Sequence, residues 1–317
     1  MKKRTIAIVA FEGFQILDVS GPASVFSSAN DALNKKVYQV VFLSANGGIV
    51  RSSSGLEIKT ITLRSMEGID TFLMAGGDEY GINKLFENKS AVNLIKKNAL
   101  SAKRYGSICT GAYVLGKLGL LNEKRITTHW NYCDKLAKEV PTATVDSNAL
   151  YVNDKRVWTS AGVTTGIDMC LQIVANDYGN AISNQIAQRL VLYARRPGYQ
   201  SQFSPVLTAQ SNAEPFVELV NWIKENISKN IDVEAMAKTA GMSYRNFYRK
   251  FVEGFGVTPA QYVKSVRIDV AKELLSTSAS LKTIAKLTGF SSATQLTKVF
   301  ETLNGISPTL FRQLNHR

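Results

Sequence analysis

The first part of the chain alternates short apolar runs with segments in which apolar residues recur at helical spacing. Four runs are apolar on both faces and end in glycine or polar residues: TIAIVAF (5–11), YQVVFLSA (38–45), DTFLMAGG (70–77) and YGSICTGA (105–112). Such runs are typical of buried parallel strands. The helical segments are SGPASVFSSANDAL (20–33), SAVNLIKKNAL (90–100) and AYVLGKLGLL (112–121). The alternation predicts an α/β domain in which helices cover both faces of a parallel sheet.

The pattern changes after a stretch that is rich in breakers and small polar residues. The segment ARRPGYQSQFSPVLTAQSNAEP (194–215) contains Pro197, Gly198 and two further prolines, which is typical of an exposed connector. Beyond it the spacing is helical, with one apolar stripe formed by Phe216, Leu219, Val220, Ile223 and Ile227. We therefore predict a first domain over residues 1–200, a linker over 201–213 and an all-α domain over 214–317.

The all-α domain contains an internal repeat. Residues 237–259 align with residues 285–308, and each copy has an alanine, a glycine four residues later and an apolar residue beyond it. A small residue lets two helices cross closely, the glycine supplies a left-handed turn, and the apolar residue holds the second helix against the first. The repeat therefore predicts two helix-turn-helix units joined by a helix over 259–279.

Four segments of this domain resemble the AraC/XylS family of transcription regulators. They are MSYRNFYRKF (242–251), RIDVAKELL (267–275), IAKLTGFSSATQLTKVF (284–300) and GISPTLFR (305–312), and the resemblance covers residues 214–315. It implies that the second helix of each unit enters a major groove of double-stranded DNA, with both units reading successive turns of one face.

Helical spacing sorts the residues of the two recognition helices. In the first, Phe247 and Phe251 face the core, which leaves Tyr244, Arg245, Tyr248 and Arg249 outward. Arg245 and Arg249 are the expected base readers, because a guanidinium can bond two acceptors of guanine. In the second, Leu296 and Phe300 face inward, and the expected DNA-facing set is Ala293, Thr294, Thr297 and Lys298. These side chains could contact either bases or phosphates, and the sequence does not distinguish the two.

The charge balance favours an anionic partner. The formal net charge is +13, from 38 Lys and Arg against 25 Asp and Glu, which suits nucleic acid or a membrane surface. Residues 214–317 carry 14 Lys and Arg against 9 Asp and Glu, so the excess is spread along the chain and does not locate the contact.

Other bulk features bound the class of protein. No apolar run approaches the roughly 20 residues of a membrane span, and the first segment reaches Glu12 and Asp18 too early for a secretory signal. We therefore expect a cytoplasmic protein. Three cysteines without CxxC spacing and two histidines, His129 and His316, predict reduced thiols, no metal cluster and no cofactor.

Cys109 follows a predicted strand directly and precedes an apolar helical segment. With Gly106, Gly111 and Ala112 around it, this is the sequence form of a nucleophile elbow, in which small neighbours permit a sharp strand-to-helix turn. Backbone N–H groups at the helix start lower a thiol pKa and can hold an oxyanion. A lone cysteine between small residues is also compatible with simple packing.

Four segments resemble the PfpI-like class I glutamine-amidotransferase superfamily. They are QILDVSGPASVF (15–26), MAGGDEYG (74–81), ICTGAYVLGKLGLLNEKRITTHW (108–130) and VWTSAGVTTGIDMCLQIVANDYG (157–179). The two most similar branches are isocyanide hydratase and the GlxA-type regulators, which join such a domain to an AraC-type one. The resemblance spans residues 4–200 and implies a flavodoxin-like parallel sheet sandwich.

The resemblance also assigns site residues. It puts Cys109 at the elbow, Asp18 at the acidic position near the thiol, Thr110 directly after the cysteine, and Gly76 with Gly77 in a loop that can donate N–H groups. His129 lies in the TTHW segment. An ionised Asp18 would raise the thiol pKa, whereas a protonated one could donate to a thiolate. Proteolytic members of the superfamily place His after the nucleophile, so Thr110 argues against a protease.

Several other residues have structural explanations. Cys133 and Cys170 lie in helical patterns and are expected to pack. Trp130 and Trp158 could form an aromatic wall for a cationic ligand, but we expect core packing for both. Asp168 lies at an expected helix start, where capping explains it. For His129, ligand contact and a structural hydrogen bond both stay open.

Together these features predict a transcription regulator, an activator, that is controlled by a small metabolite bound near Cys109 and Asp18. The resemblance suggests a nitrogenous effector, a homodimer formed through the α/β domain, and RNA polymerase as a further partner. An active isocyanide-hydratase-like enzyme that uses Cys109 is the alternative. A redox sensor is a third option, although no resolving cysteine is adjacent.

Overall fold

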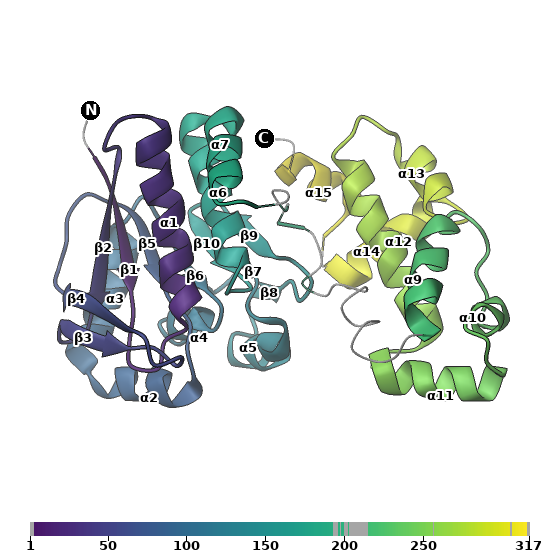
Figure 1. Cartoon of the computed structure of the whole chain (residues 1–317), viewed down its shortest axis with the longest axis horizontal. Coiled ribbons are helices and arrows are strands. Elements are labelled where there is room, and N and C mark those ends of the chain that lie inside the picture. The colour runs from purple at the N-terminus through teal and green to yellow at the C-terminus, as the bar shows by residue number, and fades with distance from the viewer. Residues whose placement is uncertain are drawn as a thin grey trace. The chain divides into compact units, whose positions relative to one another are not determined.

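The structure is a computed structural model that describes residues 3–192, 196, 198, 199, 202, 215–255, 257–304 and 306–315. The chain divides into two compact units, an N-terminal unit (Met1–Gln202) and a C-terminal unit (Phe203–Arg317) (Figure 1). The predicted linker over 201–213 lies outside the described residues, apart from Gln202.

An eight-stranded sheet forms the centre of the N-terminal unit, in the order β3-β4-β2-β1-β5-β6-β10-β9. The strands are β1 (Arg4–Val9), β2 (Tyr38–Ser44), β3 (Gly48–Arg51), β4 (Glu57–Thr62), β5 (Ile69–Met74), β6 (Arg104–Ile108), β9 (Tyr151–Asp154) and β10 (Val157–Ser160). The inner strands from β4 to β10 pair in parallel, and β3 and β9 pair antiparallel at the two edges. A separate ribbon pairs β7 (Arg125–Ile126) with β8 (Thr144–Val145). All four predicted strands are confirmed.

Helices cover both faces of this sheet, as predicted (Figure 1). They are α1 (Ile16–Ala32), α2 (Glu79–Glu87), α3 (Lys89–Ser101), α4 (Gly111–Lys117), α5 (Cys133–Glu139), α6 (Thr165–Tyr178) and α7 (Asn180–Arg189), with a short 3-10 turn, η1 (Trp130–Tyr132). Predicted helix 112–121 ends early, at Lys117, because Gly119 turns the chain with a φ of 73°. Of the other two predicted helices, 90–100 lies within α3, and 20–33 lies in α1 except for its last residue, Leu33, which caps that helix.

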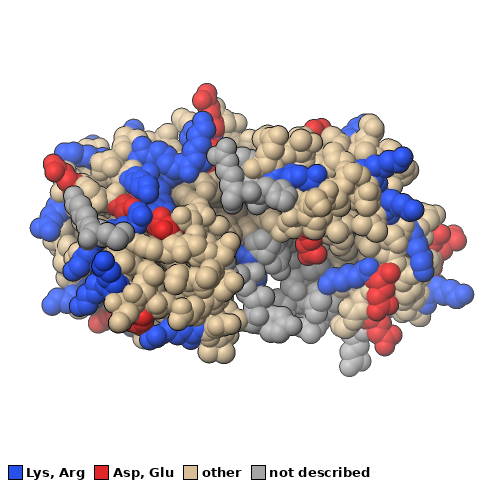
Figure 2. Space-filling view, turned by 90° about the horizontal axis from the view of Figure 1, so that it is seen from above, with Lys and Arg blue, Asp and Glu red and all other residues tan. Residues whose placement is uncertain are grey.

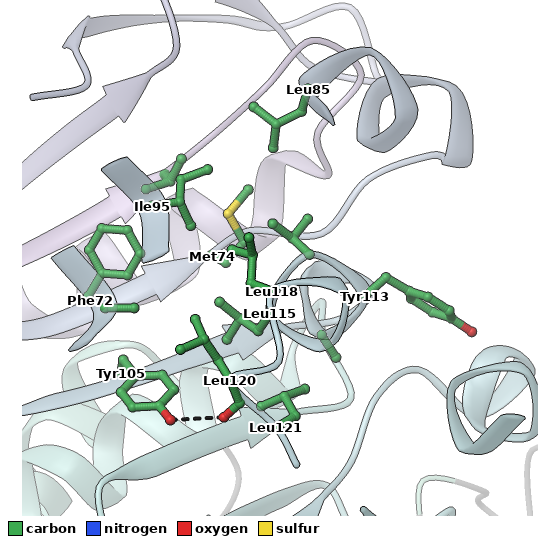
Figure 3. Packing of buried hydrophobic residues seen from close by; sticks show 14 of the residues in the cluster. Phe72, Met74, Leu85, Ile95, Tyr105, Tyr113, Leu115, Leu118, Leu120 and Leu121 are labelled. Atoms are coloured by element: carbon green, nitrogen blue, oxygen red, sulfur yellow. Dashed lines mark hydrogen bonds between the residues drawn. The ribbon is translucent and has the colours of Figure 1, made fainter. Parts of the chain in front are cut away.

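Alternate residues of each strand feed two separate hydrophobic clusters. Residues of β1, β5 and β6 pack with α1, α6 and α7 on one face, and with α2, α3, α4 and α5 on the other. Figure 3 shows the second cluster, in which Phe72 and Met74 of β5 lie near Ile95 of α3. There the Tyr105 hydroxyl donates to the Leu120 carbonyl at 2.9 Å. The sheet is therefore fixed from both sides, which holds the carboxyl ends of its strands in place.

A buried ionic cluster lies at the opposite, amino ends of the strands. Arg104 of β6 contacts Asp70 of β5 and Asp177 of α6, each at 2.6 Å, and Arg4 of β1 contacts Asp70 at 2.7 Å. Although burial opposes it, the two arginines hold the pKa of Asp70 below its ordinary value. This cluster ties three strands to one helix at a distance from Cys109, so its role is structural.

The described part of the C-terminal unit is helical. Its helices are α9 (Pro215–Glu225), α10 (Val233–Thr239), α11 (Tyr244–Phe255), α12 (Pro259–Leu275), α13 (Leu281–Leu287), α14 (Ala293–Asn304) and α15 (Pro308–Asn315). The pairs α10–α11 and α13–α14 are the two predicted helix-turn-helix units, joined by α12. Helix α12 begins with a capping box between Thr258 and Gln261 and ends at Leu275, four residues earlier than predicted.

The repeated residues have the predicted roles. Ala237 and Ala285 are buried where the helices cross, and Phe247 and Leu296 are buried beneath them. The glycines adopt left-handed backbone, with φ of 64° at Gly241 and 73° at Gly289. The predicted stripe from Phe216 to Ile227 is buried in the core that α9 shares with α10, α11 and α12.

The two turn glycines provide a matched stability test. At Gly241 an added Cβ would meet no atom within 4 Å, whereas at Gly289 it would lie 2.4 Å from the Ile227 carbonyl oxygen. We expect Gly241→Ala to lower the free energy of unfolding by about 1–2 kcal/mol, through backbone strain alone. Gly289→Ala adds a steric clash and should lower it further, as measured by urea unfolding. Equal losses in the two variants would contradict this account.

Candidate functional site

Cys109 occupies a strained turn between β6 and α4. Its φ is 54°, in the left-handed region that non-glycine residues rarely adopt. Its N–H donates to the Ser160 carbonyl at 3.0 Å, and its own carbonyl accepts from the Thr128 hydroxyl at 2.8 Å. This is the strand-to-helix geometry of a nucleophile elbow, as the sequence predicted.

Two glycines close around the cysteine. A Cβ added to Gly76, after β5, would lie 2.6 Å from the Cys109 Cβ, and one added to Gly162, after β10, would lie 2.2 Å from it. No larger side chain fits at either position without moving the elbow. Three loops, from β5, β6 and β10, therefore meet at Cys109.

Asp18, near the start of α1, lies at the same point and is completely buried. Its Oδ2 accepts from the Gly76 N–H at 2.9 Å, and its Oδ1 accepts from the Val163 N–H at 2.7 Å. Burial raises the pKa of this carboxyl to about 7, and the two hydrogen bonds oppose the rise. Asp18 thus connects α1 to two of the three loops.

The Cys109 thiol is held in its neutral form. Burial raises its pKa to about 12, the Asp18 carboxylate adds to the rise, and contacts with Thr110 oppose it. Catalytic cysteines instead have a depressed pKa in an electropositive setting. The surroundings of Cys109 therefore favour a thiol over a thiolate at neutral pH.

The N–H groups predicted to hold an oxyanion are bonded within the protein. The Gly76 N–H donates to Asp18, and the Gly77 N–H donates to the Thr110 hydroxyl at 2.9 Å. That hydroxyl also contacts the Gly77 carbonyl at 2.7 Å. Oxyanion stabilisation requires free donors aimed at the reacting oxygen. The site would have to rearrange to provide them.

His129 has a structural contact. Its Nδ1 accepts from the Asn131 N–H at 3.4 Å at the start of η1, and its ring lies against Trp130 and Tyr132. Burial lowers its pKa, which keeps the ring neutral. The prediction of core packing is confirmed for Trp158, which is 3% exposed. It is wrong for Trp130, which is 48% exposed because η1 lies at the surface.

The remaining predicted residues have clear structural partners. Cys133 and Cys170 are buried in α5 and α6, as expected. Asp168 lies in the first turn of α6, and its carboxylate also accepts the Arg196 guanidinium at 2.6 Å. Helix capping alone is thus an incomplete explanation of Asp168.

Sequence reasoning missed three contributors to the site. Gly162 and Val163, with φ of 94° and 53°, form the third loop, and Thr128 supports the Cys109 carbonyl. Gln202 is the third: its side-chain amide donates to the Thr127 hydroxyl and to the carbonyls of Thr128 and Ala149, at 2.9–3.1 Å. The glycine in SAGVTTG was the one local signal for the loop. Gln202 carries none.

The recognition helices present the predicted faces. Tyr244, Arg245, Tyr248 and Arg249 are exposed on α11, and Tyr244 stacks on Tyr248 with ring centroids 6.3 Å apart. Arg249 bonds Asn246 and pairs with Glu253 at 3.5 Å. On α14, Thr294 and Lys298 are exposed, and Ala293 and Thr297 are half-buried. Lys and Arg lie in separate groups on the face of the molecule that Figure 2 draws.

The comparisons with known proteins agree with this architecture. The DJ-1/PfpI family model matches residues 4–176, and a helix-turn-helix domain model matches residues 236–314. The chain thus joins an elbow-type α/β unit to a helix-turn-helix unit. Because the first match covers more than half of its length, the chain belongs to the DJ-1/PfpI family. Both resemblances found in the sequence are confirmed.

Two transcription regulators align along nearly the whole chain. The HTH-type transcriptional regulator GbdR of Pseudomonas aeruginosa is 25% identical over 98% of this chain and 84% of its own length. The regulator GlxA of Rhizobium meliloti is 26% identical over 97% and 95%. An isonitrile hydratase of Pseudomonas putida is 32% identical over 72% of this chain and 98% of its own length.

No helix among the described residues is long and apolar enough to cross a bilayer.

Asp18→Asn tests the electrostatics of the elbow. At pH 8 the Asp18 carboxyl is ionised, and its charge suppresses the Cys109 thiolate. We expect Cys109 in Asp18→Asn to react with iodoacetamide about tenfold faster, as each unit of thiol pKa changes the thiolate fraction tenfold. At pH 6 the carboxyl is protonated, so the difference should shrink.

Peptide mass spectrometry measures this rate at each cysteine separately. Cys133, whose pKa is raised to about 11 chiefly by burial and without Asp18, is the internal control. Circular dichroism verifies the fold of the variant. Equal Cys109 rates in the two proteins at pH 8 would contradict the account.

Proposed function

We propose that the chain is a sequence-specific DNA-binding transcription regulator whose DJ-1/PfpI unit binds a small effector and does not turn over a substrate. The observation that carries the proposal is the alignment with regulators across both units, from the elbow to the second helix-turn-helix. The exposed faces of α11 and α14 supply side chains for bases and phosphates.

We propose Arg245 and Arg249 as the base readers, with Arg245 as the principal one. Both are exposed on the outer face of α11, and Arg249 must first leave its exposed contacts with Asn246 and Glu253. Tyr244, Tyr248, Ala293, Thr294, Thr297 and Lys298 complete the proposed DNA contacts. The residues that we propose respond to the effector are Cys109, Thr110, Asp18, Gly76, Gly77 and His129. His129 directly follows Thr128, which bonds the Cys109 carbonyl.

The remaining parts of the proposal concern assembly and place of action. We infer a homodimer, a cytoplasmic location, and activation of transcription through RNA polymerase, with a nitrogenous metabolite as effector. A ligand shifts only those states that it binds unequally, so effector binding must alter the N-terminal unit. The three loops that meet at Cys109 are suited to this because they are bonded together. The Asp18 carboxylate joins the loops after β5 and β10, and the Thr110 hydroxyl joins the loop after β6 to the loop after β5.

A second candidate is isonitrile hydration, which adds water to an isonitrile to give an N-substituted formamide. It is favoured by the identity with the Pseudomonas putida isonitrile hydratase and by the retained elbow cysteine with its nearby aspartate. The neutral thiol and the internally bonded glycine N–H groups argue against it.

Arg245→Ala tests the DNA-binding function. Duplexes bound by the full chain are first selected from a random library, and affinity is then measured for the selected sequence and for random duplex at fixed salt. We expect Arg245→Ala to lose about 1–3 kcal/mol of specific binding and little non-specific binding. Lys250→Ala, an exposed change on α11 outside the proposed reading set, is the control. A library from which no sequence is enriched would overturn the proposal.

The enzyme candidate is tested with an alkyl isonitrile. We expect the purified chain to form no more formamide than buffer does, as followed by NMR, because the thiol is protonated and the Gly76 and Gly77 N–H groups are already bonded. Formamide production that disappears in Cys109→Ser would establish the second candidate instead.

A further inference from the structure

The N-terminal unit has a pocket beside the elbow that opens between α2, α4 and α5. Thr110, directly after Cys109, lines it together with Gly77, whereas Cys109, Asp18 and His129 do not. The other lining groups include two tyrosines, two glutamates and two lysines. The pocket therefore reaches the elbow through Thr110 and offers both aromatic and charged groups to a ligand.

Two tyrosines form a fixed aromatic wall. The rings of Tyr113 on α4 and Tyr132 in η1 meet edge to face, with centroids 6.2 Å apart. The Tyr113 hydroxyl donates to the Tyr132 carbonyl at 2.7 Å, and Tyr113 is buried. The wall is thus preorganised, because its geometry is set by contacts within the protein.

A side chain of the protein places a cation against this wall. The ammonium of Lys135 on α5 lies 5.8 Å from the centroid of the Tyr113 ring and 2.8 Å from the Glu79 carboxylate on α2. Its pKa is raised first by the bond with Glu79, then by the charges of Glu79 and Glu139. An aromatic face together with carboxylates is the arrangement that recognises organic cations.

The Lys135 side chain can leave this position easily. Its side chain is 45% exposed and that of Glu79 is 68% exposed, and ion pairs between such exposed groups contribute little to stability. With Lys135 withdrawn, Glu79, Glu139 and Lys117 give the lining a net charge of minus one. Lys117 is turned toward Asn83 and the ring of Phe86. A vacated pocket thus matches one positive charge.

We propose that this pocket binds a small amine in its protonated form, and that the ligand's ammonium displaces the Lys135 ammonium from Glu79 and the Tyr113 ring. The inference rests on the proposed function, since it identifies this amine as the effector. Occupancy reaches the elbow through Thr110, whose hydroxyl accepts from the Gly77 N–H and contacts the Gly77 carbonyl.

Lys135→Met tests the inference because it removes the tethered ammonium and keeps a chain of similar length. The probe is n-butylammonium, the free counterpart of the end of a lysine side chain, and n-butanol is the neutral control. We expect the full-length variant to bind n-butylammonium at least about tenfold more tightly than the unchanged protein, by NMR titration at constant ionic strength. Its affinity for n-butanol should equal that of the unchanged protein. Lys138→Met, an exposed change on α5 away from the lining, should behave like the unchanged protein.

Adding Glu79→Gln to Lys135→Met should abolish the gain, because the carboxylate partner is lost. A folded Lys135→Met protein that binds n-butylammonium no better than the unchanged protein would overturn the inference. These titrations contain no DNA. If the chain binds the amine as expected but enriches no duplex sequence, the proposed regulatory function is refuted and the proposed amine site is still supported.

Discussion

The left-handed backbone at Cys109 is the constraint on which the rest of the site depends. A non-glycine residue with this φ costs on the order of 1–2 kcal/mol and persists only where its surroundings hold it. Here they do: Gly76 and Gly162 leave no room for movement, Ser160 and Thr128 bond the backbone, and the Asp18 carboxylate ties two flanking loops together. The parallel sheet makes this possible by bringing the carboxyl ends of β5, β6 and β10 to one edge.

The same contacts explain why an enzyme-like site fits a regulator. The hydrogen-bond donors that an isonitrile hydratase would need for its substrate bond the loops to one another here, and burial keeps the thiol neutral. Thr128 supports the elbow with its hydroxyl, and its carbonyl accepts the side chain of Gln202, the last residue of the N-terminal unit. The elbow and the end of this unit therefore share one hydrogen-bonded layer.

The sequence could predict the parts of the molecule that are local. Four of the inner strands, β1, β2, β5 and β6, lie in runs that are apolar on both faces, and each helix-turn-helix has its alanine, glycine and apolar residue at fixed spacing, so the pattern alone predicted them. The edge strands β3 and β9, and β4 beside β3, were missed because they are short or largely exposed. Gly162, Val163 and Gln202 were missed for a different reason. They reach Cys109 and Thr128 only because β10 pairs with β6 and the chain returns beside them, and no local spacing encodes that.

The central claim is that two helix-turn-helix units in one chain read DNA together and that the elbow unit exists to control them. Hydroxyl-radical footprinting of the full chain on a selected duplex tests it most directly. We expect two protected patches for each bound copy of the chain, on one face of the duplex and separated by about one helical turn, from insertion of α11 and α14 in successive major grooves. A single patch, or uniform protection along the duplex, would contradict it.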